Sequence, residues 1–290
     1  MREFVLMTDS CCDLTDEKAK ELELEVLPLR LELDGASYKN WLDGREIGFK
    51  AFYDKVRGGA QATTAAVNVG EFEASMRAIL ESGRDVLCIN FSSALSATYQ
   101  SAVIAAEDVG ADFPDGKIFV VDSLGASLGQ GLLLHLCAAQ KRAGKSIEEV
   151  REFAEETKGS ICQWFTVDDL NHLKRGGRIS ATTALFGTML SIKPVMHVDA
   201  EGRLTPVSKA RGRKAALSAL VDQLGNTAAD TAGGPVFISH GDCAADAQGV
   251  ADEITRRFGN HNIFINFIGP VIGNHAGPGT IAMFFEGAPR

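Results

Sequence analysis

The sequence has few of the features that mark several large classes of protein. It carries 29 Lys and Arg against 38 Asp and Glu, a formal net charge of −9, so it lacks the basic face that nucleic acid or an anionic membrane requires. No window approaches the roughly 18 uninterrupted apolar residues of a membrane-spanning helix. The first nine residues hold too few apolar positions for a secretory signal. We therefore expect a soluble, cytoplasmic protein with no nucleic-acid partner and no stable membrane insertion.

Motifs for common cofactors are also missing. The six cysteines have neither the density of a disulfide scaffold nor the Cys-x-x-Cys spacing of a zinc site. Gly144-Lys145-Ser146 lacks the upstream glycine of a phosphate-binding loop, and no Gly-x-Gly-x-x-Gly motif occurs. We predict no cofactor, no metal and no catalytic residues. An enzyme remains an alternative because of two residues. Cys11 precedes a predicted helix, whose N-terminus would lower the pKa of its thiol, and His240 lies at a predicted strand end.

The apolar pattern of the first half alternates between short buried strands and helices. Each of three apolar runs, Phe4–Met7, Val86–Phe91 and Ile118–Val121, is followed by a polar loop and then by a helical pattern. This alternation is typical of an α/β fold with a doubly wound parallel sheet. We therefore predict an N-terminal α/β lobe over residues 1–159.

Beyond Gly159 a second set of strands and helices begins, which predicts a C-terminal α/β lobe over residues 160–290. The predicted strands are Ile161–Val167, Pro194–Val198, Thr205–Ser208, Val236–Ser239, Ile263–Ile268 and Ile281–Phe285. The predicted helices are Asp168–Leu173, Ala181–Leu190, Lys214–Leu224 and Ala244–Phe258. A glycine-rich loop is predicted between the last two strands.

Hydroxyl side chains are concentrated at the predicted strand exits of the first lobe. Because strand exits converge in a parallel sheet, these hydroxyls and the amides of helix starts predict a site for one anion. A carboxylate can be held by two hydroxyls and an imidazole, and His275 lies among glycines that allow close backbone approach. The hydroxyl-bearing residues are Thr63, Thr64, Ser92, Ser93, Ser96, Thr98, Ser123 and Ser127.

A head group held by uncharged donors leaves most of the affinity to the rest of the ligand. Burying an acyl chain yields about 0.8 kcal/mol per methylene, so roughly fifteen methylenes yield on the order of 12 kcal/mol before the costs of association. The apolar segments Ala181–Leu190, Ile263–Ile272 and the helix from Leu132 are candidate linings for such a tail.

Several ordered blocks resemble the signature blocks of the DegV family of bacterial fatty-acid-binding proteins, which includes the binding subunits of fatty acid kinase. The resemblance spans nearly the whole chain and rests on Asp9–Leu14, Ser92–Ala102, Val121–Ser123, Leu173–Ser180, Ile192–Val195 and Gly277–Thr280. The chain differs from the family pattern at Ala65–Val67, where Ser-Gln-Pro is common, and at Ala97, where glycine is usual.

The resemblance implies a two-lobed α/β protein that encloses one long-chain fatty acid, such as palmitate, and has no catalytic residues of its own. It assigns the carboxylate to Thr63, Ser93 and His275, with Arg211 and Ser96 in supporting roles. A partner, the catalytic subunit of fatty acid kinase, would supply ATP and magnesium and form the acyl phosphate.

The basic turn Lys174–Arg178 resembles the family's docking site for that kinase, and the resemblance gives this role to Arg175 and Arg178. Two alternatives stay open beside this hypothesis. One is a stand-alone enzyme acting on a small phosphorylated or carboxylated metabolite; the other is a regulatory protein that senses lipid.

Overall fold

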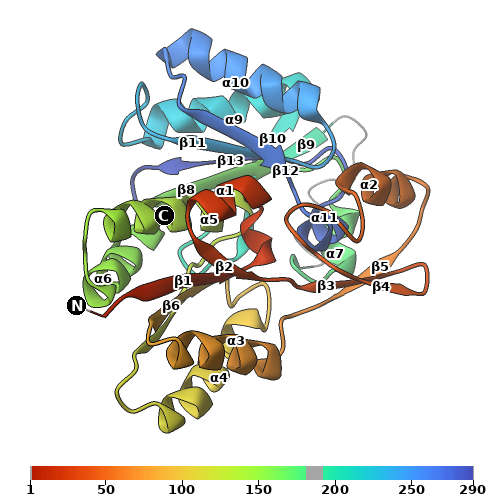
Figure 1. Cartoon of the computed structure of the whole chain (residues 1–290). Coiled ribbons are helices and arrows are strands. Elements are labelled where there is room, and N and C mark those ends of the chain that lie inside the picture. Colours follow the sequence, from red (N-terminus) through yellow and green to blue (C-terminus); the bar gives the residue numbers. More distant parts are fainter. Residues whose placement is uncertain (1, 181–191, 290) are drawn as a thin grey trace.

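A parallel sheet forms the first half of the chain. The computed structural model describes residues 2–180 and 192–289. The strand order is β2-β1-β6-β7, and all neighbours are parallel. Helices α3 and α4 cover one face, and α5 and α6 lie on the other (Figure 1). The elements are β1 (Phe4–Asp9), β2 (Leu24–Leu27), β6 (Asp85–Asn90), β7 (Ile118–Asp122), α1 (Asp16–Glu21), α3 (Val69–Glu81), α4 (Thr98–Asp112), α5 (Leu128–Arg142) and α6 (Ile147–Thr157).

A mixed sheet of order β10-β9-β8-β13-β11-β12 forms the second half. Only the β11–β12 pair is parallel among its described pairings. Helices α9 and α10 cover its outer side, whereas α5 packs against β8, β11 and β13 on the inner side. The elements are β8 (Ile161–Thr166), β9 (Ile192–Val198), β10 (Leu204–Arg211), β11 (Val236–His240), β12 (Ile263–Phe267), β13 (Ile281–Glu286), α7 (Asn171–Arg175), α9 (Arg213–Thr227) and α10 (Ala244–Phe258).

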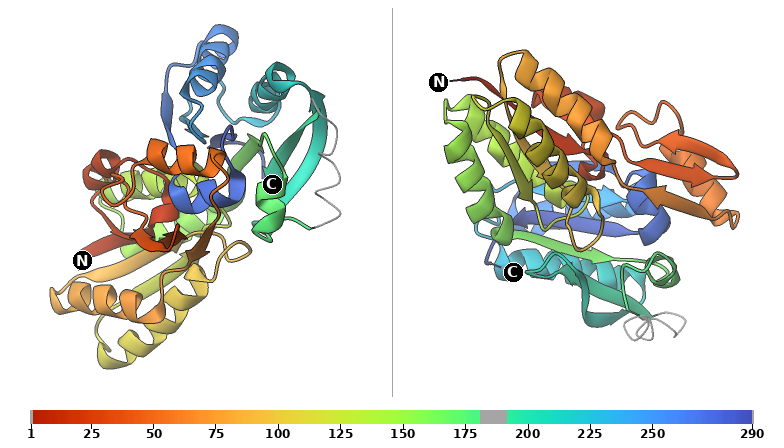
Figure 2. Two further views of the ribbon diagram at one scale, coloured as in Figure 1. Left: turned by 90° about the vertical axis from the view of Figure 1, so that its right-hand side faces the viewer. Right: turned by 90° about the horizontal axis from the view of Figure 1, so that it is seen from below.

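A small antiparallel sheet, β4-β3-β5, extends past the end of the first sheet (Figure 2). It consists of β3 (Arg30–Leu33), β4 (Ala36–Lys39) and β5 (Ala62–Ala65), with α2 (Phe49–Arg57) between β4 and β5 in the chain. Helix α11 (Pro270–Ala276) from the second half packs against α2, β3, β5 and α7. This contact joins the small sheet to the second half, and the Tyr53 hydroxyl donates a 2.9 Å hydrogen bond to the Ile268 carbonyl across it.

The two halves share a continuous interior. The chain passes from the first sheet to the second through a 3-10 turn at Lys158–Ser160, where the sequence predicts the lobe boundary. One buried apolar cluster nevertheless runs from β1 through α5 to β11 and β13. Buried polar groups also cross between the halves: the Ser127 hydroxyl lies 2.6 Å from an Asp13 carboxylate oxygen and 2.9 Å from the Ser239 hydroxyl.

The predicted α/β fold class is confirmed, and three local predictions are corrected. Thr63 and Thr64 do not lie at a strand exit but inside β5, whose alternating pattern of small side chains gives little strand signal. The predicted glycine-rich loop contains α11, which starts with Pro270 at its first position. The helix predicted from Asp168 begins at Asn171. The helix predicted at 181–190 lies outside the described residues.

Candidate ligand-binding site

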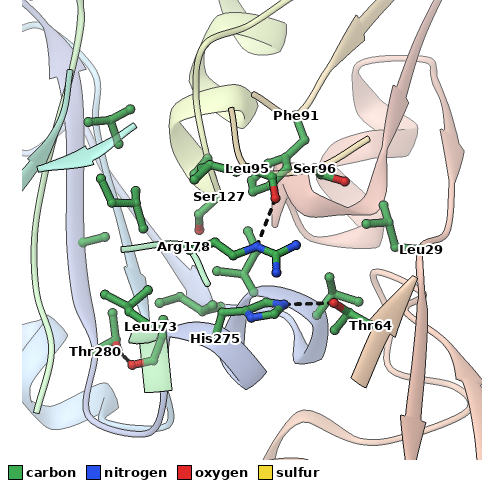
Figure 3. Close-up of a pocket in the computed structure, with 18 of the residues that line it drawn as sticks. Leu29, Thr64, Phe91, Leu95, Ser96, Ser127, Leu173, Arg178, His275 and Thr280 are labelled. Carbon is green, nitrogen blue, oxygen red and sulfur yellow. Dashed lines mark hydrogen bonds between the residues drawn. The ribbon is translucent and has the colours of Figure 1, made fainter. Parts of the chain in front are cut away.

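An apolar cavity of about 240 Å³ lies between the two halves. Strand-exit loops of the first sheet form one side, and β8, β13 and α11 form the other (Figure 3). Its apolar lining includes Leu29, Phe91, Leu95, Phe165, Leu173, Val198, Leu204, Ile268, Val271, Ile272, Ala282 and Phe284. The cavity can therefore shield an apolar ligand from water.

One end of this apolar cavity is polar. The Thr64 hydroxyl and His275 Nε2 are 2.9 Å apart and join β5 to α11. The Arg178 guanidinium lies beside them and donates from Nε to the Leu95 carbonyl at 3.1 Å (Figure 3). Ser96 also lines the cavity. Hydroxyl, imidazole and guanidinium groups together can bind a carboxylate.

The charge at this end comes from Arg178 and not from His275. Burial, with a smaller effect from the Arg178 charge, lowers the pKa of His275 to about 4, so the imidazole is neutral at pH 7. Burial also lowers the pKa of Arg178, but a guanidinium remains protonated at neutral pH. The structure therefore adds a charged donor to the uncharged hydroxyl and imidazole donors that the sequence predicts.

The surroundings of His275 favour one arrangement of its ring proton. Its Nδ1 is buried without a hydrogen-bond partner, and a Cβ at Gly176 would clash with it, so only glycine fits there. A buried N–H without an acceptor is costly, which favours the tautomer with its proton on Nε2. Nε2 then donates to Thr64, and the Thr64 hydroxyl is left free to donate to a ligand.

A second, polar cavity of about 340 Å³ shares Thr64, Arg178 and His275 with the apolar cavity. Its remaining lining residues are Val56, Ala60, Gln61, Ala62, Thr63, His172, Arg175, Gly176 and Asn274. The three shared residues therefore separate an apolar compartment from a polar one.

The residues that the resemblance assigns to the carboxylate do not all line the same cavity. His275 and Ser96 line the apolar cavity as expected. Thr63 is exposed and lines only the polar cavity, because successive residues of β5 point to opposite faces. Ser93 is exposed at the exit of β6, where its amide donates to Asp122 at 3.2 Å, and Arg211 is exposed at the end of β10. Thr63, Ser93 and Arg211 are not among the lining residues of the apolar cavity.

The two arginines predicted to dock a partner differ in position. Arg175 is exposed at the end of α7, with Nη2 2.9 Å from His172 Nδ1. Arg178 is half-buried and lines both cavities. The sequence includes Thr64 among the hydroxyl residues of the predicted anion site, but it gives no signal that Arg178 lines the apolar cavity.

Of the three segments predicted to line a cavity for the acyl tail, the structure describes two, and only one of these lines the apolar cavity. Ile268, Val271 and Ile272 line the apolar cavity, in agreement with the prediction for Ile263–Ile272. The helix from Leu132 is solid core instead, because α5 lies between the two sheets and Leu132 is fully buried. The third candidate, 181–190, lies outside the described residues.

The structure gives little support to the alternative enzyme sites. Burial raises the pKa of the Cys11 thiol well above its usual value, and Asp9 and Asp13 add to the effect. Burial lowers the pKa of His240, whose ring packs on Phe267 at 4.4 Å between centroids. No group of three or more His, Cys, Asp or Glu suited to a metal occurs among the described residues.

No helix in the described part of the chain is both long and apolar enough to cross a membrane.

Comparisons with known proteins give a family for the whole chain. Residues 3–288 match the model described as "Uncharacterised protein, DegV family". A DegV domain-containing protein of Clostridium perfringens is 42% identical over 287 residues, which cover 99% of this chain and 98% of that protein. A DegV domain-containing protein of Caldanaerobacter subterraneus is 34% identical, with 99% of each chain covered.

Solved structures agree with this match. A DegV family protein of Thermus thermophilus, described as binding fatty acid, has a TM-score of 0.86 and 31% identity, with 99% of this chain and 100% of that chain covered. A DegV lipid-binding protein of Thermotoga maritima has a TM-score of 0.87 and 27% identity, with 99% of each chain covered. The chain described here therefore belongs to the DegV family.

Proposed function

We propose that this protein binds one long-chain fatty acid, with the acyl tail in the apolar cavity and the carboxylate at Thr64, Arg178 and His275. The observation that carries the proposal is the apolar cavity itself, whose lining is mostly apolar and whose one charged side chain, Arg178, lies beside Thr64 and His275. The fatty-acid binding described for the Thermus thermophilus relative supports the same ligand class.

The tail supplies most of the binding free energy in this proposal. Each buried methylene contributes about 0.8 kcal/mol, so a C16 chain gains on the order of 12 kcal/mol before the entropic costs of association. The carboxylate contributes one charge-assisted contact with Arg178, worth about 1.5–3 kcal/mol. The head group therefore sets the orientation of the ligand, and the tail sets its affinity.

We further propose that the protein presents the carboxylate to the catalytic subunit of a fatty acid kinase and has no catalytic residues of its own. In that reaction a carboxylate oxygen attacks the γ-phosphorus of ATP, the bond to the β,γ-bridging oxygen breaks, and ADP leaves. ATP and magnesium belong to the partner. The resemblance of the Leu173–Ser180 block and the exposure of Arg175 support this step.

Native mass spectrometry of the purified protein, before and after delipidation and readdition of palmitate, tests ligand binding. The proposal predicts one bound acyl chain per protein. Recovery without any acyl ligand, together with no uptake of added palmitate, would refute it. A kinase assay with the partner subunit and palmitate-bound protein tests the second step separately. If no acyl phosphate forms although palmitate is bound, the presentation role is refuted and fatty-acid binding is not.

A further inference from the structure

Ser127 lies in a strained backbone turn beside the apolar cavity. It directly precedes α5, and its φ of 53° and ψ of −139° place it in a region that residues other than glycine rarely adopt. The segment Gly125-Ala126-Ser127-Leu128-Gly129 has the Gly-x-Ser-x-Gly spacing of a nucleophile elbow, a sharp turn between a strand and a helix that exposes a serine hydroxyl. Here the turn joins β7 to α5, and Ser127 lines the apolar cavity (Figure 3).

The two glycines of this motif allow the turn to pack closely against β8 and β13. A Cβ at Gly129 would clash with the Gln163 carboxamide and would lie 2.9 Å from the Phe284 ring. A Cβ at Gly125 would lie 3.0 Å from Gln163 Nε2. Gln163 is buried, and its Oε1 accepts a 3.0 Å hydrogen bond from the Ala126 amide. The neighbouring strands therefore hold the strained turn in place, which is the condition for such a backbone to persist.

The Ser127 hydroxyl has a carboxyl group as its partner. Its Oγ lies 2.6 Å from Asp13 Oδ2, and Asp13 Oδ1 accepts a 2.9 Å hydrogen bond from the Gly269 amide. Burial raises the pKa of Asp13 from 3.8 to about 7, which suits a general base that works near neutral pH. The Ser239 hydroxyl lies 2.9 Å from Ser127 Oγ and can donate to it while Ser127 donates to Asp13. These contacts orient a serine–aspartate pair in which the carboxylate can accept the serine proton.

The start of α5 supplies a donor for negative charge that develops on a carbonyl oxygen. Leu128 follows the serine and is the first residue of this helix. The first N–H groups of a helix have no acceptor within the helix. In a nucleophile elbow, the N–H of the residue after the nucleophile is one of the oxyanion-hole donors. The turn therefore places a nucleophile and an oxyanion donor next to each other at the wall of the apolar cavity.

We propose that Ser127 is the nucleophile, and Asp13 the general base, of an acyl hydrolase reaction on a long-chain acyl ester or thioester whose tail occupies the apolar cavity. The inference goes beyond the proposed function and rests on it only for the position of the tail. It concerns a step separate from the kinase reaction, to which this chain contributes no catalytic residue. The product is a fatty acid, so the chain releases its own ligand from an ester and retains it.

Two acyl transfers make up the reaction. In the first, Asp13 takes the Ser127 proton as Oγ bonds to the carbonyl carbon; the bond from that carbon to the oxygen or sulfur of the leaving group breaks, and the leaving group takes the proton from Asp13. In the second, a water molecule gives a proton to Asp13 and bonds to the carbonyl carbon. The bond to Ser127 Oγ then breaks, and Oγ recovers a proton from Asp13. One ester or thioester and one water yield one alcohol or thiol and one fatty acid.

Labelling of the delipidated wild-type protein tests the nucleophile without any substitution. A fluorophosphonate with a long alkyl chain phosphonylates an activated serine as fluoride leaves, and peptide mass spectrometry locates the adduct. The proposal predicts one adduct per protein, on Ser127, and protection of this residue by palmitate. No adduct, or an adduct on other residues only, would overturn the proposal.

Turnover of p-nitrophenyl palmitate and of the palmitoyl thioester of N-acetylcysteamine tests the reaction. Ser127→Ala should lower the rate by at least about 100-fold, and Asp13→Asn by at least about tenfold. Ser218→Ala, at an exposed position of α9 outside the cavity lining, removes a serine hydroxyl as the matched control and should leave the rate within about twofold. No turnover of either probe by the wild-type protein, or unchanged turnover by Ser127→Ala, refutes the hydrolase.

Native mass spectrometry with palmitate separates a loss of the reaction from a loss of the fold or of the ligand. Each variant should still take up one palmitate, because the tail supplies most of the binding free energy. If Ser127→Ala loses palmitate uptake as well as turnover, the labelling of the wild-type protein decides. Palmitate uptake by the wild-type protein without labelling or turnover refutes only the hydrolase. If the wild-type protein takes up no palmitate, the proposed function fails and the hydrolase fails with it.

Discussion

Replacing Arg178 by glutamine tests the assignment of charge at the polar end of the apolar cavity. The guanidinium is the charged group there, because burial holds the pKa of His275 near 4 and keeps that ring neutral. A hydrogen bond to a charged group contributes about 1.5–3 kcal/mol, which corresponds to a loss of roughly 10- to 150-fold in Kd. Since Arg178 is only half-buried, we expect the lower part of this range, about 10- to 30-fold, for palmitate.

The assay must separate binding from folding, because Arg178 also donates to the Leu95 and Gly176 carbonyls. Hexadecanol has the same tail length and no charge, so its affinity measures any damage to the cavity. The prediction is a 10- to 30-fold loss for palmitate with less than about a twofold change for hexadecanol, measured by displacement of a fluorescent lipid. Equal losses for both ligands, or an unchanged affinity for palmitate, would refute the assignment.

Three further changes test other parts of the structure. Thr64→Val should weaken palmitate binding about tenfold and Thr63→Val should not, because only Thr64 lines the apolar cavity; calorimetry showing the reverse order would favour the residue assigned by resemblance. Ala282→Leu narrows the apolar cavity and should reduce the affinity for a C16 acid more than for a C10 acid in competition assays; equal losses would contradict the placement of the tail. Burial raises the pKa of Asp13 from 3.8 to about 7, so the folded chain retains a proton that the unfolded chain releases. The free energy of unfolding of the wild-type protein, measured in urea relative to that of Asp13→Asn, should therefore fall as the pH rises from about 4 to about 7. A difference between the two proteins that does not change with pH would contradict this.

The main strands could be predicted from sequence because each is a short, wholly buried apolar run. All residues of β1 and β6 are buried, which produces the pattern of a central parallel strand. Strand β5 could not be predicted in this way. Its sequence, Ala62–Ala65, has small and polar side chains, and its strand conformation depends on pairing with β3, more than 25 residues earlier in the chain.

The types of residue at the candidate site could be predicted from the sequence, but the positions of their side chains could not. Ser96 and Ser127 line the apolar cavity as candidates from loops after parallel strands, which converge, and Thr64 and His275 line it from other elements. The other predicted hydroxyl residues, Thr63, Ser92, Ser93, Thr98 and Ser123, do not line it. The choice between Thr63 and Thr64 depends on which face of β5 meets the cavity, and neighbouring strand residues point in opposite directions. The inward position of Arg178 depends on the Leu95 carbonyl, 83 residues away, and no local pattern reports such a contact.

The departures from the family pattern lie at the site itself. Ala65, Ala66 and Ala97 line the apolar cavity, where the family pattern has polar residues or glycine. Their methyl groups make the wall near the head group more apolar. The remaining polar contacts there, from Thr64, Arg178 and His275, are therefore expected to carry more of the carboxylate recognition.

A crystal structure of the delipidated protein reloaded with palmitate is the most direct test of the central claim. The account predicts one acyl chain in the apolar cavity, with its carboxylate within hydrogen-bonding distance of the Thr64 hydroxyl and the Arg178 guanidinium. An acyl chain in the opposite orientation, a carboxylate away from both side chains, or palmitate bound outside this cavity would contradict it.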